Sequence, residues 1–205
     1  MNEMIEENEN VGVFNPVMKS LMSPRDTIRF VLENESRKYY WILMYLLGFT
    51  KSMDNYAKRA YDIDVSVIVL LPMFAIISGI IYVYFTSWVM SWFGKLFGGV
   101  ATLEHLRISM LWSSVPEMLI LPIALVTFIG GADNLEYLVL GNFIATVLYC
   151  ILAVIEIVIG IWCFVNLVRM VSEVQEFSNG KAFLSIILPK LILIALMIVL
   201  FFRTG

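Results

Sequence analysis

The sequence predicts an all-α membrane protein, a polytopic helix bundle of five transmembrane helices, the first one short, plus an N-terminal amphipathic helix. Of its 205 residues, 60% are hydrophobic and only 15% are charged, and the mean hydropathy is +0.85. The apolar residues gather in uninterrupted blocks of about 20 residues or more, which is the length that a helix needs to cross a bilayer. Because backbone polar groups in lipid must be satisfied within each segment, helices are expected. The blocks are residues 65–89, 108–129, 137–168 and 183–202.

The chain before these blocks divides into two parts. Residues 1–14 hold four glutamates and predict a disordered acidic tail. Residues 15–38 form a cytoplasmic amphipathic segment, in which Ser23 suits a helix N-cap and Pro24 the first helical position. The apolar stripe that follows at helical spacing consists of Ile28, Val31 and Leu32. With its flanking basic residues, this helix either lies on an anionic membrane surface or packs against the bundle.

Residues 39–50 are the short first span, about 18 Å long as a helix, and open a single transmembrane domain over 39–205. The loop 130–136 has acidic residues but no Lys or Arg, so it is expected outside. The basic N-terminal region is expected in the cytoplasm, and both conditions hold only if 39–50 crosses. Counts of Lys and Arg are the same for a four-span model with 39–50 kept inside, so the five-span prediction depends on the loop that lacks Lys and Arg.

Three ionisable residues lie well inside the apolar blocks, where a charge is expensive. In the five-span topology Glu117, Glu156 and Lys190 all fall in the inner half of the bilayer. We therefore expect a buried cluster in which Lys190 pairs with one of the two glutamates. Such a cluster is either a packing pair that sets the helix register or a pathway for protons or solutes. Its expected members are Glu117, Glu156, Lys190, Ser113, Ser114 and Asn142.

Signals of catalysis are missing from the sequence. His105 is the single histidine, and no set of His and Cys residues has metal-ligand spacing. Cys150 and Cys163 lie about 20 Å apart along one helix, too far to form a disulfide. No serine has an evident base. The sequence therefore predicts no enzymatic activity, no cofactor, no metal and no nucleic-acid partner.

The cytoplasmic connections offer a surface for a protein partner. Residues 172–177 are expected to extend the preceding span, and Asn179-Gly180 to end that helix in a left-handed turn. Together with the 90–107 loop and the N-terminal helix, they form the expected binding face; a merely solvated loop is the alternative. The residues expected to contact the partner are Pro24, Arg25, Gly98, Gly99, Glu104, Arg107, Glu173, Gln175 and Phe177.

Four segments share their order and spacing with a known family. They are Asn15-Pro16 with Ser23–Ile28, Trp92–Gly99 with Ala101, Glu104 and Arg107, Trp112–Pro116, and Ser172–Ser178 with Lys181-Ala182. Together they cover residues 15–202 and resemble bacterial members of the Yip domain family (Ypt-interacting-protein type). The resemblance implies a five-helix membrane protein with a cytoplasmic N-terminus. Glu117 and Lys190 are not part of this pattern.

The resemblance also implies partners. Eukaryotic relatives are associated with Rab-type GTPases and vesicle trafficking, which a bacterium lacks, and some bacterial relatives with ABC-type exporters and defence against toxic peptides. We therefore expect a non-enzymatic adaptor or accessory subunit in a bacterial cytoplasmic membrane. It would engage the lipid bilayer, another membrane protein and a possible second copy of itself. The alternative is a small transporter or channel-like protein that uses the Glu/Lys cluster.

Overall fold

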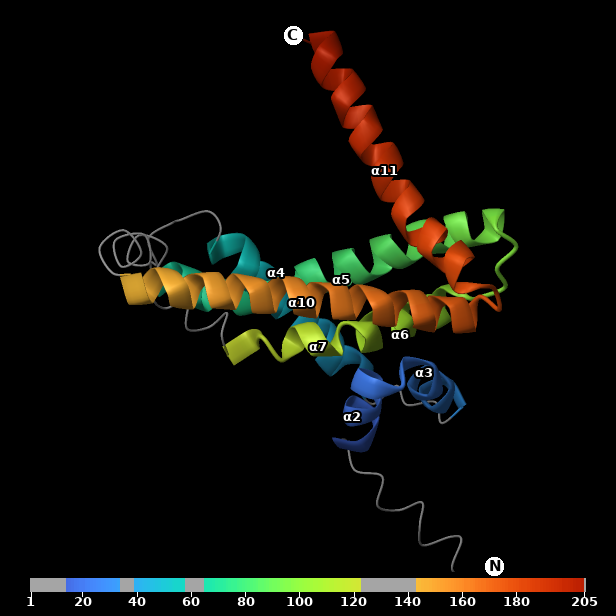
Figure 1. Cartoon of the computed structure of the whole chain (residues 1–205), viewed down its shortest axis with the longest axis horizontal. Coiled ribbons are helices and arrows are strands. Elements are labelled where there is room, and N and C mark those ends of the chain that lie inside the picture. Colours follow the sequence, from blue (N-terminus) through green and yellow to red (C-terminus); the bar gives the residue numbers. More distant parts are fainter. Residues whose placement is uncertain (1–13, 34–38, 58–64, 123–142, 205) are drawn as a thin grey trace, which may run out of the picture. The chain divides into compact units, whose positions relative to one another are not determined.

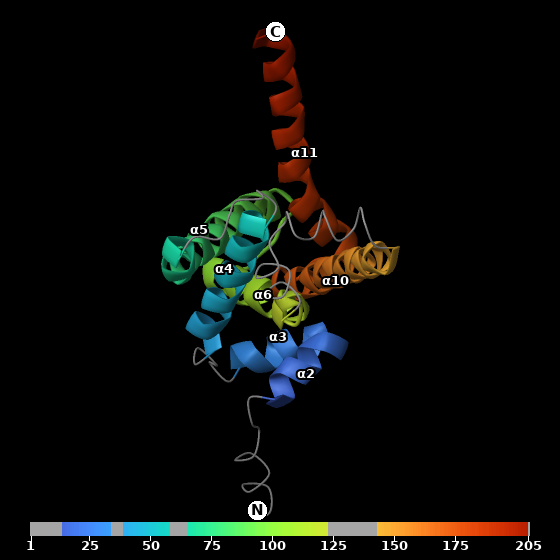
Figure 2. The same cartoon turned by 90° about the vertical axis from the view of Figure 1, so that its left-hand side faces the viewer.

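The structure, a computed structural model, describes residues 14–33, 39–57, 65–122 and 143–204. Within these ranges the chain forms eight helices and no strand, which confirms the all-α fold class (Figure 1). Figure 2 shows the same helices from the side. Three predictions concern residues outside the described ranges: most of the acidic tail (1–13), the loop without Lys or Arg (130–136) and Asn142. The helices are α2 (Phe14–Met22), α3 (Pro24–Glu33), α4 (Tyr40–Ala57), α5 (Val65–Leu96), α6 (Leu103–Ser113), α7 (Val115–Met118), α10 (Phe143–Val174) and α11 (Asn179–Thr204).

The N-terminal segment forms two helices that meet at Ser23 and Pro24. The Ser23 carbonyl accepts the Thr27 N–H at 3.0 Å, so α3 begins at Pro24 as the sequence predicts. The apolar stripe of α3 is buried, with Ile28 0% and Val31 2% exposed. Of the two interpretations left open by the sequence, the structure therefore favours the helix packed on protein over the helix lying on lipid.

Helix α4 is longer than the predicted short span. It covers 18 residues, or about 27 Å at 1.5 Å per residue, and continues seven residues beyond position 50. Its buried side shows the helical period of an amphipathic element, so that α4 packs as one rod. The buried members of this side are Leu43, Met44, Leu47, Thr50 and Met53. The extension places Lys51 and Ser52 inside the helix.

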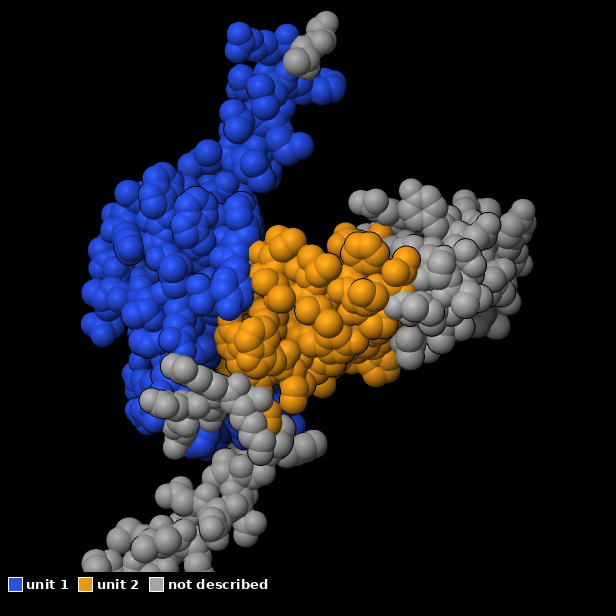
Figure 3. Space-filling model, turned by 180° about the vertical axis from the view of Figure 1, so that it is seen from behind, with its two compact units in different colours: residues 1–35, 84–110, 166–205 blue, residues 36–83, 111–165 orange. Residues whose placement is uncertain are grey.

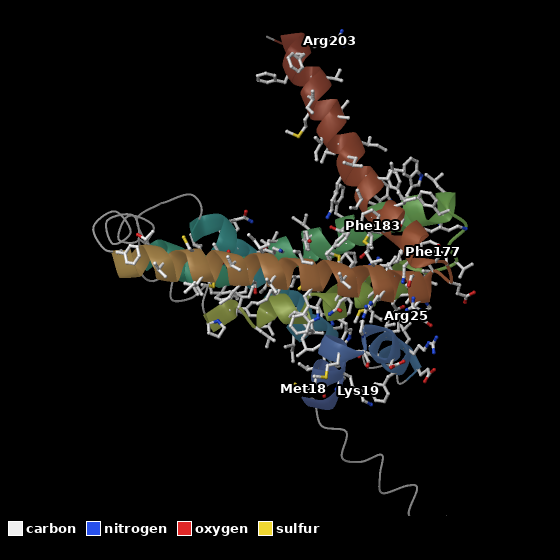
Figure 4. All side chains as sticks on the ribbon, viewed as in Figure 1. Met18, Lys19, Arg25, Phe177, Phe183 and Arg203 are labelled. Atoms are coloured by element: carbon white, nitrogen blue, oxygen red, sulfur yellow. The ribbon has the colours of Figure 1, made fainter. Side chains whose placement is uncertain are left out.

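Among the described residues, three helices are long and apolar enough to cross a membrane. The qualifying stretches are Leu70–Leu96 in α5, Cys150–Val174 in α10 and Asn179–Arg203 in α11. They match three of the four predicted apolar blocks. The large apolar side chains of α11 from Leu191 to Phe202 are all exposed (Figure 4), as expected for a helix whose surroundings are lipid.

The remaining block, 108–129, is not one uninterrupted helix over its described part. Helix α6 begins earlier, at Leu103, and ends at Ser113; the short α7 follows from Val115. Pro116 explains the break, because proline has no N–H for the helical bond and its ring crowds the carbonyl four residues before it. The Glu117 and Met118 N–H groups instead donate to the Ser114 carbonyl.

The described chain forms two compact units, which Figure 3 shows in different colours. Unit 1 consists of residues 1–35, 84–110 and 166–205, and unit 2 of residues 36–83 and 111–165. The core of unit 1 buries Leu106, Met110, Met170 and Val171 together with the apolar side of α3. The core of unit 2 includes Met53 and Leu71, with Phe49 and Leu121 packed against them.

Candidate functional site

Helix α5 ends in unit 1 with a left-handed glycine. Gly98 has a φ of 81°, its N–H donates to the Lys95 carbonyl at 3.1 Å, and the Gly99 N–H donates to the Gly94 carbonyl at 2.9 Å. These two bonds make a Schellman motif, which satisfies carbonyls that the helix end leaves open. Because glycine has no Cβ, Gly98 adopts this conformation without strain.

Helix α10 ends in the same motif, but with glutamate at the left-handed position. Glu176 has a φ of 55°, its N–H donates to the Glu173 carbonyl at 3.3 Å, and the Phe177 N–H donates to the Ser172 carbonyl at 3.2 Å. The predicted extension of the span is confirmed for residues 172–174, whereas residues 175–177 form the turn that ends the helix. The predicted stop at Asn179-Gly180 is wrong, because Asn179 is already the first residue of α11.

Replacing Glu176 with glycine is expected to stabilise the protein. An L-residue in the left-handed region is strained by about 1 kcal/mol, and glycine removes that strain at this exposed position. We expect Glu176→Gly to raise the melting temperature in detergent and Glu176→Val to lower it. A melting temperature that falls in the glycine variant would contradict the strained turn.

Gln175 joins the two helix ends. Its side-chain Oε1 accepts the Ala101 N–H at 3.1 Å, and its backbone carbonyl accepts the Val100 N–H at 3.4 Å. Gly94 and Gly99 lie directly against its amide, where any Cβ would overlap it. The side chain of Gln175 is consequently sealed from solvent, with 1% exposed. We call this set, formed by Gly94, Gly98–Ala101 and Gln175–Phe177, the Gln175 junction.

The N-terminal helices are tied to the end of α10 next to the junction. Arg29 contacts Glu173 at 2.5 Å, and Arg25 lies 3.8 Å from the same carboxylate. Arg25 also donates to the Asn179 side chain at 2.8 Å. The Asn166 amide donates to the Ser20 carbonyl at 3.2 Å. Three segments far apart in sequence therefore meet at one end of unit 1, where Figure 4 labels Arg25 and Phe177.

Most residues expected to contact a partner lie in or beside this assembly. Gln175 and Pro24 are buried and have no surface to offer a partner, which differs from the expectation. Gln175 instead makes its hydrogen bond inside the junction, and Pro24 begins α3. Arg107 stacks on the Tyr84 ring at 4.0 Å. Accessible surface remains on Arg25, Gly98, Glu104 and, in part, on Gly99, Arg107, Glu173 and Phe177.

In unit 2, α4 and α5 cross at two glycines. A Cβ on Gly48 would overlap the Ala75 carbonyl and come within 2.8 Å of the Gly79 backbone. A Cβ on Gly79 would come within 2.5 Å of the Met44 carbonyl. Small residues at such crossings let membrane helices approach closely and form polar contacts across the interface. One turn further along α4, the hydroxyls of Ser52 and Ser78 lie 2.9 Å apart.

Beside this crossing, Lys51 on α4 forms an ion pair with Glu117 on α7. The Lys51 ammonium also lies 5.8 Å from the Tyr82 ring centroid. The cation on Glu117 is thus Lys51, where the sequence suggested Lys190. The reason is the length of α4: a helix that ended at position 50 would have placed Lys51 in an outer loop.

The other described members of the expected intramembrane cluster lie on different elements. Ser113 is buried and Ser114 lies at the break between α6 and α7. Glu156 on α10 and Lys190 on α11 are exposed. Glu156 belongs to unit 2 and Lys190 to unit 1, and their pairing stays a prediction.

Several residues of both sites were missed by reasoning from the sequence: Arg29, Gly94, Asn166, Lys51, Gly48 and Gly79. One signal could have found Lys51, because residues 39–50 reach a crossing length only if the helix continues through it. Within the described residues, no group of three His, Cys, Asp or Glu side chains could hold a metal ion.

Comparison with known proteins points to one family. No curated protein and no solved structure matched the chain. A family model did match, and it covers residues 18–201, from α2 to the last turn of α11. This range includes the Gln175 junction, the Arg–Glu173 contacts and the α4–α5 crossing. The chain belongs to the family of the Yip1 domain.

Proposed function

We propose that this protein is a non-enzymatic membrane adaptor that engages another membrane protein through the cytoplasmic end of unit 1. The observation that carries the proposal is the Gln175 junction. It joins the α5–α6 connection and the α10–α11 connection, and the Glu173 contacts add the N-terminal helices. Loops held in this way form a preorganised surface, which lowers the entropy that a partner must overcome on binding.

The same contacts support a five-span arrangement. The N-terminal helices contact the end of α10, and the end of α5 contacts Gln175. These parts therefore share one side of the membrane. Because α5 runs for 32 residues, about 48 Å, its beginning belongs on the opposite side. In this arrangement the intervening α4 crosses, and the basic N-terminal region favours the cytoplasm for the shared side.

The exposed part of this end mixes apolar and charged side chains. Val100 is 63% exposed and Trp92 60%, and Glu104, in the first turn of α6, is exposed as well. Aromatic and apolar residues surrounded by charges are typical of protein interfaces. The family resemblance makes a subunit of an ABC-type exporter in a bacterial cytoplasmic membrane the first candidate partner.

The test is co-purification with a defined exporter subunit expressed together with the tagged chain. We expect Glu104→Lys to lower the recovered partner about fivefold, the effect of about 1 kcal/mol at an interface, and to reduce stability by no more than the roughly 0.3–1 kcal/mol of a reversed charge at a helix end. Arg203→Glu, an exposed charge reversal in the last turn of α11, is the matched control and should not alter recovery. Equal recovery from both variants would contradict the assigned surface.

A transporter is the second candidate function, favoured by the Lys51–Glu117 pair inside unit 2. Intramembrane ion pairs mark ion and substrate pathways in many membrane proteins. Liposomes that contain only this chain would then show solute or proton flux. Loss of flux in the double variant Lys51→Met with Glu117→Gln, which removes the pair without leaving one charge alone, would favour this function over the adaptor if flux is retained in the exposed-site variant Lys95→Gln.

A further inference from the structure

Helix α4 does not have the composition of an independent membrane span. It is not among the three stretches that qualify by length and hydropathy, and it contains both Lys51 and Asp54. Lys51 stands 11 residues after Tyr40, about 17 Å along the axis. That distance places its charge near the middle of a hydrocarbon core about 30 Å thick, where an uncompensated ammonium is expensive.

The packing of α4 against α5 determines the position of the Lys51 side chain. The backbones of the two helices touch at Gly48 and Gly79, and the Ser52–Ser78 contact sets their register. Ser78 also lies 3.3 Å from the Gly48 carbonyl. In this register Lys51 projects beside Tyr82, whose ring face attracts a cation.

Glu117 is held at the matching depth by the break between α6 and α7. It follows Arg107 by ten residues, about 15 Å, close to the depth of Lys51. Its backbone N–H donates to the Ser114 carbonyl at 3.0 Å, so the turn that Pro116 imposes positions it. The Lys51 and Glu117 side chains are only 32% and 24% exposed. Two opposite charges in contact present lipid with a far smaller field than either one alone.

We propose that α5 and α7 form an intramolecular docking site for α4, in which Glu117 is the counter-charge that lets α4 cross the membrane. This inference rests on the five-span arrangement of the proposed function. Lys51 and Glu117 are positioning residues here, and their role is to compensate each other's charge. The crossing of α4 therefore depends on Glu117, which lies 66 positions after Lys51 in the chain and is synthesised later.

The test measures the side on which the end of α4 lies. Ala60, three positions beyond the end of α4 in the sequence, is changed to Cys in a background that carries Cys150→Ser and Cys163→Ser. Right-side-out membrane vesicles are treated with a membrane-impermeant maleimide, and total thiol is measured after permeabilisation. We expect outside labelling of the parent and at least a tenfold loss in Glu117→Gln, which keeps the charge of Lys51 and removes the counter-charge of Glu117.

Two rescue variants separate charge compensation from simple damage to the fold. The exchange Lys51→Glu with Glu117→Lys restores the pair, and Lys51→Met with Glu117→Gln removes both charges. We expect both double variants to label from outside as the parent does. Glu156→Gln, a change at an exposed glutamate on α10, is the control and should label normally.

Each outcome decides a different statement. If Glu117→Gln labels like the parent, the proposed role of the pair is wrong. If neither double variant regains labelling, compensation of charge is not the mechanism and the proposal is likewise overturned. If the parent itself is not labelled from outside, the five-span arrangement fails, whereas the exporter co-purification tests the adaptor function separately.

Discussion

Gly48→Ala is expected to separate α4 from α5 and to destabilise the protein by about 3 kcal/mol, at the upper end of the range for overpacking. All the atoms that the new methyl group would meet belong to backbone, namely the Ala75 carbonyl and the Gly79 Cα and N. A backbone in a packed helix cannot rotate away as a side-chain end can. The whole crossing would have to open, and the polar contacts beside it would open as well.

The measurement uses the serine pair next to the crossing. In a background without the native cysteines, Ser52→Cys with Ser78→Cys should form a disulfide under mild oxidation, since the two hydroxyls lie 2.9 Å apart. Adding Gly48→Ala should abolish that disulfide and lower the folded fraction that survives heating in detergent.

Gly160→Ala is the matched control for this experiment. Gly160 also lies within a membrane helix, but a Cβ there would meet nothing within 4 Å. Alanine favours a helix over glycine by about 1 kcal/mol, so this variant should be at least as stable as the parent. If Gly48→Ala behaved like Gly160→Ala, the close crossing would be disproved.

Gln175→Ala is expected to lower the free energy of unfolding by about 2–4 kcal/mol. It removes the acceptor of the Ala101 N–H, which is then buried without a partner. It also empties the space between Gly94 and Gly99. The loss would loosen the α5–α6 and α10–α11 connections together, because one side chain holds both.

A variant of similar side-chain volume separates the loss of the hydrogen bond from the loss of packing. Gln175→Met keeps the packing and loses the hydrogen bond, so it should cost about 1–3 kcal/mol, less than alanine. Lys95→Ala, an exposed change in the last turn of α5, is the control and should leave the melting temperature within about 1 °C, since isolated surface changes have small effects. Thermal unfolding in detergent ranks the variants. A methionine variant as stable as the parent would show that the Ala101 bond contributes nothing.

The expected loss of partner binding in Gln175→Ala connects stability with function. Gln175 has no exposed surface, so any effect on co-purification must act through the shape of the connections. Glu104→Lys, in contrast, should weaken binding while costing no more stability than the helix-end control Arg203→Glu. The two variants together distinguish residues that form the surface from residues that hold it.

Some features of the fold followed directly from local patterns. The start of α3 at Pro24 was predictable, because an N-cap serine and a proline act within one turn. The ends of α4 and α10 were not. The left-handed turn at Glu176 lacks the glycine that would have predicted it, and α4 continues through Lys51, whose ion-pair partner Glu117 lies 66 positions later in the chain.

The candidate sites divide in the same way. Glu117 stood out as a charge within an apolar block, and Gln175 and Glu173 as polar residues beyond the end of a span. Their partners did not stand out, because Lys51, Ala101 and Arg29 are 66, 74 and 144 positions away. A helical period relates residues three or four apart and carries no information on such pairs.

The sequence by itself determined that the chain is helical and lives in a membrane, because lipid offers the backbone no hydrogen bonds and each segment must satisfy its own locally. Only the tertiary structure decided which cation pairs with Glu117, which side chain joins the α5–α6 and α10–α11 connections, and which face of α3 is buried. Those outcomes depend on how rigid helices fit together at glycines and helix breaks, and that fit is a property of the packed chain.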